Sequence, residues 1–255
     1  MTAYIIRRLL MAVIILILVT LIIFFVMHLL PGDPLIIYIG QQAGSGSFTE
    51  EQIDELYRRF GLDQPLMVQY WNWITGIMQG DMGESIFYHD DVADLLMERF
   101  PPTLVLGIES FIFYNILGIV LGMLAALRRG TWIDTCATVF SYLGVSIPVF
   151  WLALLLIYGF GLHLEWFPIA EYVLPWEDFL GSLHASVLPV ICLSLMGWAT
   201  IMRQTRSSVL EVVSQDYIRT AWAKGLTERV IVFKHMLKNA LIPVITMMGI
   251  GLGLM

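Results

Sequence analysis

The chain has 255 residues, of which 58% are hydrophobic and only 14% are charged. Soluble domains are about 45–50% apolar and about 25% charged, so this composition excludes an ordinary soluble protein and indicates an integral membrane protein. The formal net charge is −7, and both cysteines, Cys136 and Cys192, fall in apolar runs, which argues against a disulfide framework and against a cysteine metal site.

The first apolar run, residues 9–30, predicts a membrane span. At about 1.5 Å per residue the run is about 33 Å long as a helix, enough to cross a hydrocarbon core of about 30 Å. A cleaved signal peptide is the alternative, but the run is too long and His28-Leu29-Leu30-Pro31 offers no small-residue cleavage site. We therefore expect residues 1–30 to form a retained N-terminal span.

Residues 31–102 are expected to form an extracytoplasmic loop that is partly helical. Thr49-Glu50-Glu51-Gln52 has capping-box spacing, and apolar residues then recur with helical periodicity from Ile53, which predicts a short amphipathic helix. The segment Tyr70-Trp71-Asn72-Trp73 is aromatic enough to lie at the headgroup level, with packing inside a small cap as the alternative.

Residues 103–127 predict the second span. Gly118 and Gly122 are four residues apart, a spacing that lets another helix approach closely. Glu109 is a candidate for the transport pathway, because a carboxylate at the centre of a membrane helix costs about 2.5–3.5 kcal/mol; the alternative is that it reaches the interface. Asn115, on the face of the two glycines, is a second pathway candidate.

Three further apolar runs follow, at residues 136–160, 186–202 and 239–255. Pro148 lies in the middle of the first of these runs and should bend it, because proline cannot donate a helical hydrogen bond. Ser146, next to this bend, is a third pathway candidate. The complete set of runs predicts an all-α, polytopic membrane helical bundle with five visible spans.

The basic residues indicate the orientation, because cytoplasmic loops carry an excess of Lys and Arg. Only Arg58, Arg59 and Arg99 fall on one side of the predicted spans, and the other eleven of the fourteen fall on the opposite side. The amino terminus and residues 203–238 are therefore expected in the cytoplasm. Residues 103–255 form the predicted transmembrane core, which includes this cytoplasmic loop.

The loop 203–238 is the candidate functional site. Gly225 lies where one helix has to end and another to begin, and glycine adopts a left-handed backbone there without strain. A helix–glycine–helix element between two spans favours a rigid contact surface over a flexible tether. We therefore interpret the segment around Gly225 as the place where a soluble motor protein contacts a membrane protein.

The sequence lacks three motifs that would indicate nucleotide binding, a zinc site or a catalytic nucleophile. It contains no Gly-x-x-x-x-Gly-Lys-Ser/Thr phosphate loop, no His-Glu-x-x-His zinc pair and no Gly-x-Ser-x-Gly nucleophile elbow. Its five histidines are scattered without ligand spacing. We expect no catalytic site, no metal site and no cofactor.

The cytoplasmic loop carries the most specific pattern of the sequence. It reads Arg203-x-x-Arg206-Ser207-Ser208-x-Leu210-Glu211-Val212, then Asp216-Tyr217-Ile218-Arg219-Thr220-Ala221-x-Ala223-Lys224-Gly225-Leu226, then His235-x-Leu237-x-Asn239-Ala240-x-x-Pro243. Shorter motifs accompany it at residues 30–34, 61–65, 80–85 and 144–151. In this order, over essentially the whole chain, they resemble the permease subunits of peptide- and nickel-type ATP-binding cassette (ABC) importers, with the loop as their version of the EAA motif.

The resemblance implies a set of partners. They are a second, similar permease subunit, two ATP-binding subunits that hydrolyse ATP, and an extracytoplasmic substrate-binding protein, all assembled at the inner membrane of a prokaryote. It implies neither an enzyme activity for this chain nor a nucleic-acid partner. The expected substrate is a di- or oligopeptide, with nickel or a metal chelate as the alternative. A self-contained secondary transporter or channel is the alternative from another class, but it predicts internal repeats, and we find no convincing one.

The resemblance also implies which residues couple ATP hydrolysis to transport. The candidate ATPase-coupling residues are Asp216, Arg219, Ala221, Lys224, Gly225, Leu226, Glu228 and Arg229. Arg219 departs from the general EAA motif, which usually has a glutamate at that position. Family members continue through a complete fifth span and a sixth, whereas this sequence ends within the fifth, so we expect it to be truncated relative to the family.

Overall fold

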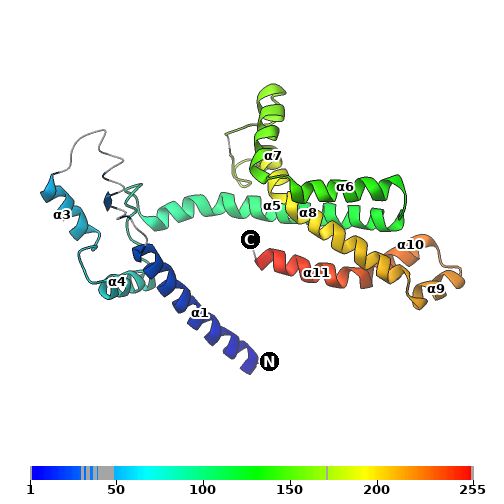
Figure 1. Ribbon diagram of the computed structural model, residues 1–255, viewed down its shortest axis with the longest axis horizontal. Helices are drawn as coiled ribbons and strands as arrows, with labels where there is room; N and C mark the ends of the chain where they lie inside the picture. Colours follow the sequence, from blue (N-terminus) through cyan, green and yellow to red (C-terminus); the bar gives the residue numbers. More distant parts are fainter. Residues whose placement is uncertain are drawn as a thin grey trace. The chain divides into compact units, whose positions relative to one another are not determined.

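The computed structural model describes residues 2–29, 32, 35–36, 39, 49–170 and 172–253. Within these residues the regular structure is helical, apart from a single isolated β-bridge between Glu84 and Asp91, which confirms the all-α prediction. The chain divides into two compact units, Met1–Arg99 and Phe100–Met255, which are described separately (Figure 1).

The first unit contains helices α1 (Thr2–Leu29), α3 (Glu50–Arg59) and α4 (Leu66–Gln79). None of the residues of α1 is buried, as expected of a span whose apolar side chains face lipid. The predicted capping box is confirmed: the Thr49 hydroxyl accepts from the Gln52 backbone, and the Gln52 side chain accepts from the Thr49 backbone.

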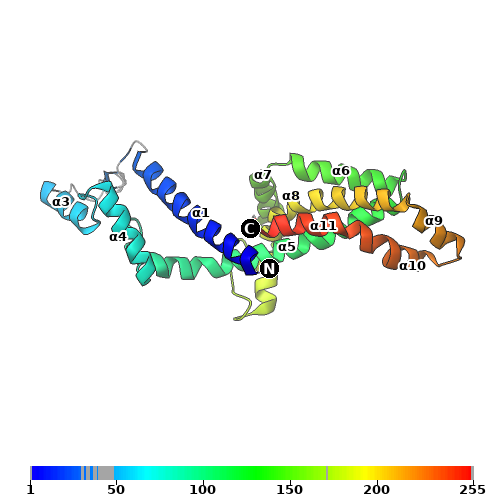
Figure 2. The ribbon, with the colours of Figure 1, turned by 90° about the horizontal axis from the view of Figure 1, so that it is seen from below.

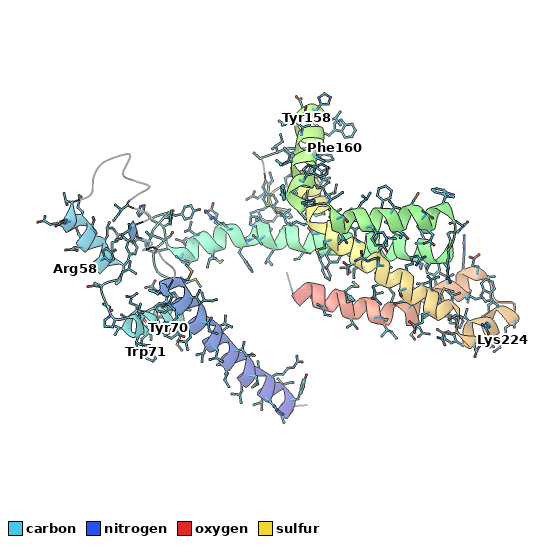
Figure 3. The ribbon with its side chains drawn as sticks, viewed as in Figure 1. Arg58, Tyr70, Trp71, Tyr158, Phe160 and Lys224 are labelled. Carbon is cyan, nitrogen blue, oxygen red and sulfur yellow. The ribbon has the colours of Figure 1, made fainter. Side chains whose placement is uncertain are left out.

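The aromatic segment of α4 packs against the second half of α1. The Tyr70 and Thr20 hydroxyls are 3.1 Å apart, and the Tyr70 ring centroid lies 5.4 Å from that of Phe24. Trp71, by contrast, is 66% exposed (Figure 3). Tyr70 therefore fits the packing alternative, whereas the exposed Trp71 remains compatible with a position at the headgroup level.

The second unit is built around α8 (Phe179–Val213), which packs against α6 (Trp132–Ser146), α7 (Val149–Leu156) and α11 (Leu237–Gly253) (Figures 1 and 2). The remaining elements are α5 (Val92–Leu127), of which the residues from Phe100 belong to this unit, α9 (Asp216–Ala223), α10 (Glu228–Val230) and the π-helices η1 (Ile157–His163) and η2 (Ile231–Met236).

Small residues allow α5 and α8 to approach closely. A Cβ added at Gly118 would lie 2.8 Å from the Ile201 side chain, and one at Gly122 would lie 2.5 Å from the Met202 carbonyl oxygen. The predicted close approach at these glycines is therefore confirmed. Hydroxyls join the helices where the backbones are near, as in the Ser194 Oγ–Ser110 carbonyl hydrogen bond at 3.2 Å.

The predicted bend at Pro148 is a complete break. The two helices that meet there, α6 and the α7–η1 segment, are inclined by 105°, and Ile147 between them is extended. Proline disfavours helical backbone in the preceding residue, so α6 ends before it. Four helices of the described chain are long and apolar enough to cross a membrane, and the predicted total of five spans is reached only if the broken pair, the third predicted span, counts as one.

The fourth span is longer than predicted at both ends. Its expected limits were residues 186 and 202, but α8 begins at Phe179, because Asp178 caps it by accepting from the Leu180 N–H at 3.1 Å. Pro189 lies inside the helix, and α8 continues to Val213. The first part of the predicted cytoplasmic loop is therefore a rigid extension of the span.

Candidate functional site

The centre of the loop is a tight turn at Gly225 between α9 and α10. Gly225 has a φ of +73°, and its N–H donates to the Trp222 carbonyl at 2.9 Å. A Cβ added at Gly225 would meet no atom within 4 Å, so backbone conformation rather than space requires glycine here. This geometry confirms the predicted helix–glycine–helix element, which we call the coupling element (residues 216–230) after the role that the sequence predicts for it.

The coupling element is anchored to the spans by buried apolar side chains. Ile218 and Ala221 on α9 are 1% and 5% exposed, and both pack in one cluster. The other buried members of this cluster come from α5, α8, η2 and α11 and are Ala126, Val209, Ile231, Val232, Met236 and Ala240. This cluster therefore joins α9 to side chains of α5, α8, η2 and α11 in one close-packed core.

A hydrogen bond adds a second link between α9 and the last span. The Asn239 side-chain amide donates to the Tyr217 hydroxyl at 2.8 Å. Both residues belong to the loop motif, but the sequence does not indicate that they meet, since they are separated by the turn and by η2.

The candidate coupling residues divide into an exposed and an inward-facing group. The exposed ones are Asp216, Arg219, Lys224, Gly225, Glu228 and Arg229, and Lys224 lies at the tip of the element (Figure 3). Arg219 and Asp216 form an exposed ion pair at 3.5 Å. Ala221 is buried and Leu226 is half-buried against the apolar cluster, so these two side chains hold the element in place rather than present themselves to a partner.

An ion pair that was not predicted from the sequence connects α6 with α8. The Arg206 guanidinium donates from Nε to Asp134 Oδ1 at 2.7 Å and from Nη2 to Oδ2 at 2.9 Å. The Gly130 N–H also donates to Oδ2, at 3.1 Å. Asp134 is 7% exposed. The sequence offered one signal for this ion pair, which was the acidic Asp134 in the first turn of an apolar helix. The predicted span, however, began two residues after Asp134.

The comparisons with known proteins agree with this architecture. Residues 118–255 match the family of binding-protein-dependent transport system inner membrane components, and residues 1–107 match the N-terminal family of the same membrane components. The chain belongs to this family. It is therefore the membrane component, or permease, of a binding-protein-dependent ABC transport system, a class that works with ATPase and substrate-binding partners.

Relatives match this chain over almost its entire length. A putative peptide transport system permease protein of Brucella abortus (strain 2308) is 38% identical over 98% of this chain and 78% of its own length. The glutathione transport system permease protein GsiC of Escherichia coli O6:H1 is 39% identical over 99% of this chain and 78% of its own. A probable peptide ABC transporter permease protein of Sinorhizobium fredii is 37% identical over 100% of this chain and 80% of its own.

The three pathway candidates lie on two helices of the permease, α5 and α6. Glu109 and Asn115 are both on α5; Glu109 is half-buried, whereas Asn115 is 3% exposed and donates to the Phe111 carbonyl at 2.8 Å. Ser146 is the exposed last residue of α6, at the break before Pro148. No hydrogen bond joins these three within the described chain, where no group of His, Cys, Asp and Glu suited to a metal is found either.

Proposed function

We propose that this permease forms the translocation pathway for di- or oligopeptides in the inner membrane of a prokaryote. It acts together with a second permease subunit, two ATP-binding subunits and an extracytoplasmic binding protein. The observation that carries the coupling role is the rigid element 216–230, whose apolar side is anchored among α5, α8 and α11 while its polar side is exposed. The peptide substrate is supported by the relatives, several of which are named as peptide transport permeases.

In this proposal ATP-driven closure of the ATP-binding subunits pushes on the coupling element. Exposed Arg219, Lys224 and Arg229 pair with acidic groups of the ATPase, because complementary charge fixes the register of a docked surface. The apolar cluster carries the displacement to α8 and α11 as a rigid-body movement. The Arg206–Asp134 ion pair carries it on to α6.

The pathway itself is proposed to involve Glu109, Asn115 and Ser146. Glu109 and Asn115 each have an oxygen that is buried without a hydrogen-bond partner, so both retain unused capacity for a polar solute. Ser146 is exposed at the break between α6 and α7, where the helix ends and leaves carbonyl groups free.

Replacing Gly225 with valine is expected to uncouple ATP hydrolysis from uptake while the protein still inserts. A β-branched residue at a φ of +73° is strained, so the turn rearranges and α9 no longer meets the ATPase in register. We expect uptake per ATP hydrolysed to fall about tenfold, a loss equivalent to about 1.4 kcal/mol of coupling free energy. The measurement compares ATPase rate and solute uptake in proteoliposomes that contain the full complex.

The matched control is Gly225→Asn, because asparagine tolerates the left-handed backbone and adds a side chain of similar size. It should retain coupling. Normal coupling in the valine variant, or equal loss in both variants, would count against a role for this turn.

The peptide assignment is tested through the partner binding protein. We expect that protein, purified with its bound ligand, to release a short peptide that the complete transporter then imports into proteoliposomes with ATP. Release of a nickel chelate instead, with no competition by peptides, would replace the proposed substrate and leave the coupling role untouched.

A further inference from the structure

The contact between α9 and the start of α11 includes a directional interaction. The Asn239 side-chain amide donates to the Tyr217 hydroxyl oxygen at 2.8 Å and to the His235 carbonyl oxygen at 3.4 Å. A carbonyl oxygen only accepts hydrogen bonds, so the nitrogen of the amide rather than its oxygen has to face these two atoms. The orientation of Asn239 is therefore fixed, and Tyr217 accepts the bond that joins the two helices.

The apolar contacts of α9 define its rotation less well than its position. Of its eight residues, only Ile218 and Ala221 are buried members of the apolar cluster. These two residues are three apart, so they lie on the same side of the helix. Hydrophobic burial is not directional. This narrow stripe therefore holds α9 against the spans but leaves its rotation about its own axis weakly determined.

The bond to Tyr217 supplies the missing constraint. Within the part of the chain that the structure describes, it is the one side-chain hydrogen bond that connects α9 with another helix, because those of Arg219 and Thr220 stay within α9. Tyr217 precedes Ile218, so it lies about 100° around the helix from it, at the flank of the apolar stripe. A rotation of α9 at this flank lengthens or bends the bond, and hydrogen bonds weaken steeply with both changes.

The rotation of α9 also determines where its cationic side points. Arg219 lies two residues beyond Tyr217, and its side chain is 75% exposed. An α-helix with its side chains has a radius of about 5–6 Å, so a rotation of about 20° moves the exposed end of such a side chain by about 2 Å. A displacement of this size exceeds the range of distances over which a hydrogen bond forms.

We propose that Tyr217 and Asn239 are positioning residues of the coupling element. Their hydrogen bond fixes the rotation of α9 against α11, and so it sets the register in which Arg219 meets the ATP-binding subunit. The inference rests on the proposed function, since it requires residues 216–230 to link the ATPase with the spans. Tyr217 is 42% exposed and Asn239 is exposed as well, so water replaces the bond when it is lost, and stability changes little.

The test measures how strongly the extracytoplasmic binding protein changes the affinity of the full complex for the ATP analogue AMP-PNP. Coupling between two binding sites is reciprocal, so this ratio of affinities reports the link whatever the solute is. We expect a ratio of about tenfold in the unaltered complex, and a ratio about threefold smaller in Tyr217→Phe and in Asn239→Leu. The double variant should fall no further, because both changes remove the same bond. The melting temperature should stay within about 2 °C in every variant.

Two further variants separate the hydrogen bond from other effects of substitution. Asn239→Asp is the conservative variant, because the Tyr217 O–H can donate to a carboxylate, and it should keep most of the ratio. Thr220→Val is the matched control and should keep the full ratio. Thr220 is an exposed residue of α9 whose hydroxyl donates to the Asp216 carbonyl at 2.9 Å, within the helix.

An unchanged ratio in Tyr217→Phe and Asn239→Leu, with a reduced ratio in Gly225→Val, would overturn the inference and leave the proposed coupling role intact. Equal losses in Asn239→Leu and Asn239→Asp would also overturn it, and so would a fall of the melting temperature by more than about 5 °C in Tyr217→Phe, which indicates a structural contact. A ratio of one in the unaltered complex would contradict the proposed function itself, so the two failures are distinguishable.

Discussion

Replacing Asp134 with alanine is expected to lower the free energy of unfolding by about 2–3 kcal/mol. The change leaves the Arg206 guanidinium without its bidentate partner beside α6, and breaking a fully buried ion pair typically costs about 3–5 kcal/mol. The lower figure applies because the Arg206 side chain is 31% exposed and is partly rehydrated. Unfolding of the purified permease, followed by circular dichroism during denaturant titration, measures the effect.

A double-mutant cycle isolates the contribution of the pair. Asp134→Ala, Arg206→Ala and the double variant should show a coupling energy above about 1 kcal/mol, since the two side chains form one network. Asp216→Ala is the control, because its ion pair with Arg219 is exposed, and it should change stability by at most about 0.5 kcal/mol. A coupling energy near zero would show that Asp134 and Arg206 act independently.

Replacing Gly122 with leucine is expected to separate α5 from α8 and to prevent normal assembly of the second unit. Even a single added Cβ would lie 2.5 Å from the Met202 carbonyl oxygen and 2.7 Å from the Thr205 Cβ, where backbone has to move. Overpacking typically costs about 1–3 kcal/mol, so we expect Gly122→Ala in that range and Gly122→Leu above it. The yield of folded protein and the melting temperature report both effects.

Gly249→Ala is the matched control for this series. Gly249 also lies in a helix, α11, but a Cβ added there would meet no atom within 4 Å. Alanine favours helix over glycine by about 1 kcal/mol, so the control should be neutral or slightly stabilising. An equal loss of stability in Gly122→Ala and Gly249→Ala would mean that helix packing at Gly122 is not the cause.

Much of the candidate site was predictable because its signals are local. The turn at Gly225 follows from one glycine between two helical patterns, and the capping box at Thr49 follows from a spacing of three residues. Helix limits were less predictable, since the extent of α8 depends on a cap at Asp178 and on burial of residues beyond Met202, such as Thr205 and Val209. The break at Pro148 was also only partly predictable, because the sequence indicated a bend but not its 105° angle.

The sequence by itself determined that this is a polytopic helical membrane protein, and it predicts how the protein is oriented and where it contacts a partner. Apolar length, the distribution of basic residues and the glycine turn are properties of short segments, so they need no knowledge of packing. Only the tertiary structure decided that Asp134 pairs with Arg206 and that Ala221 faces inward. These relations join residues far apart in the chain, and they depend on how each helix is rotated against its neighbours.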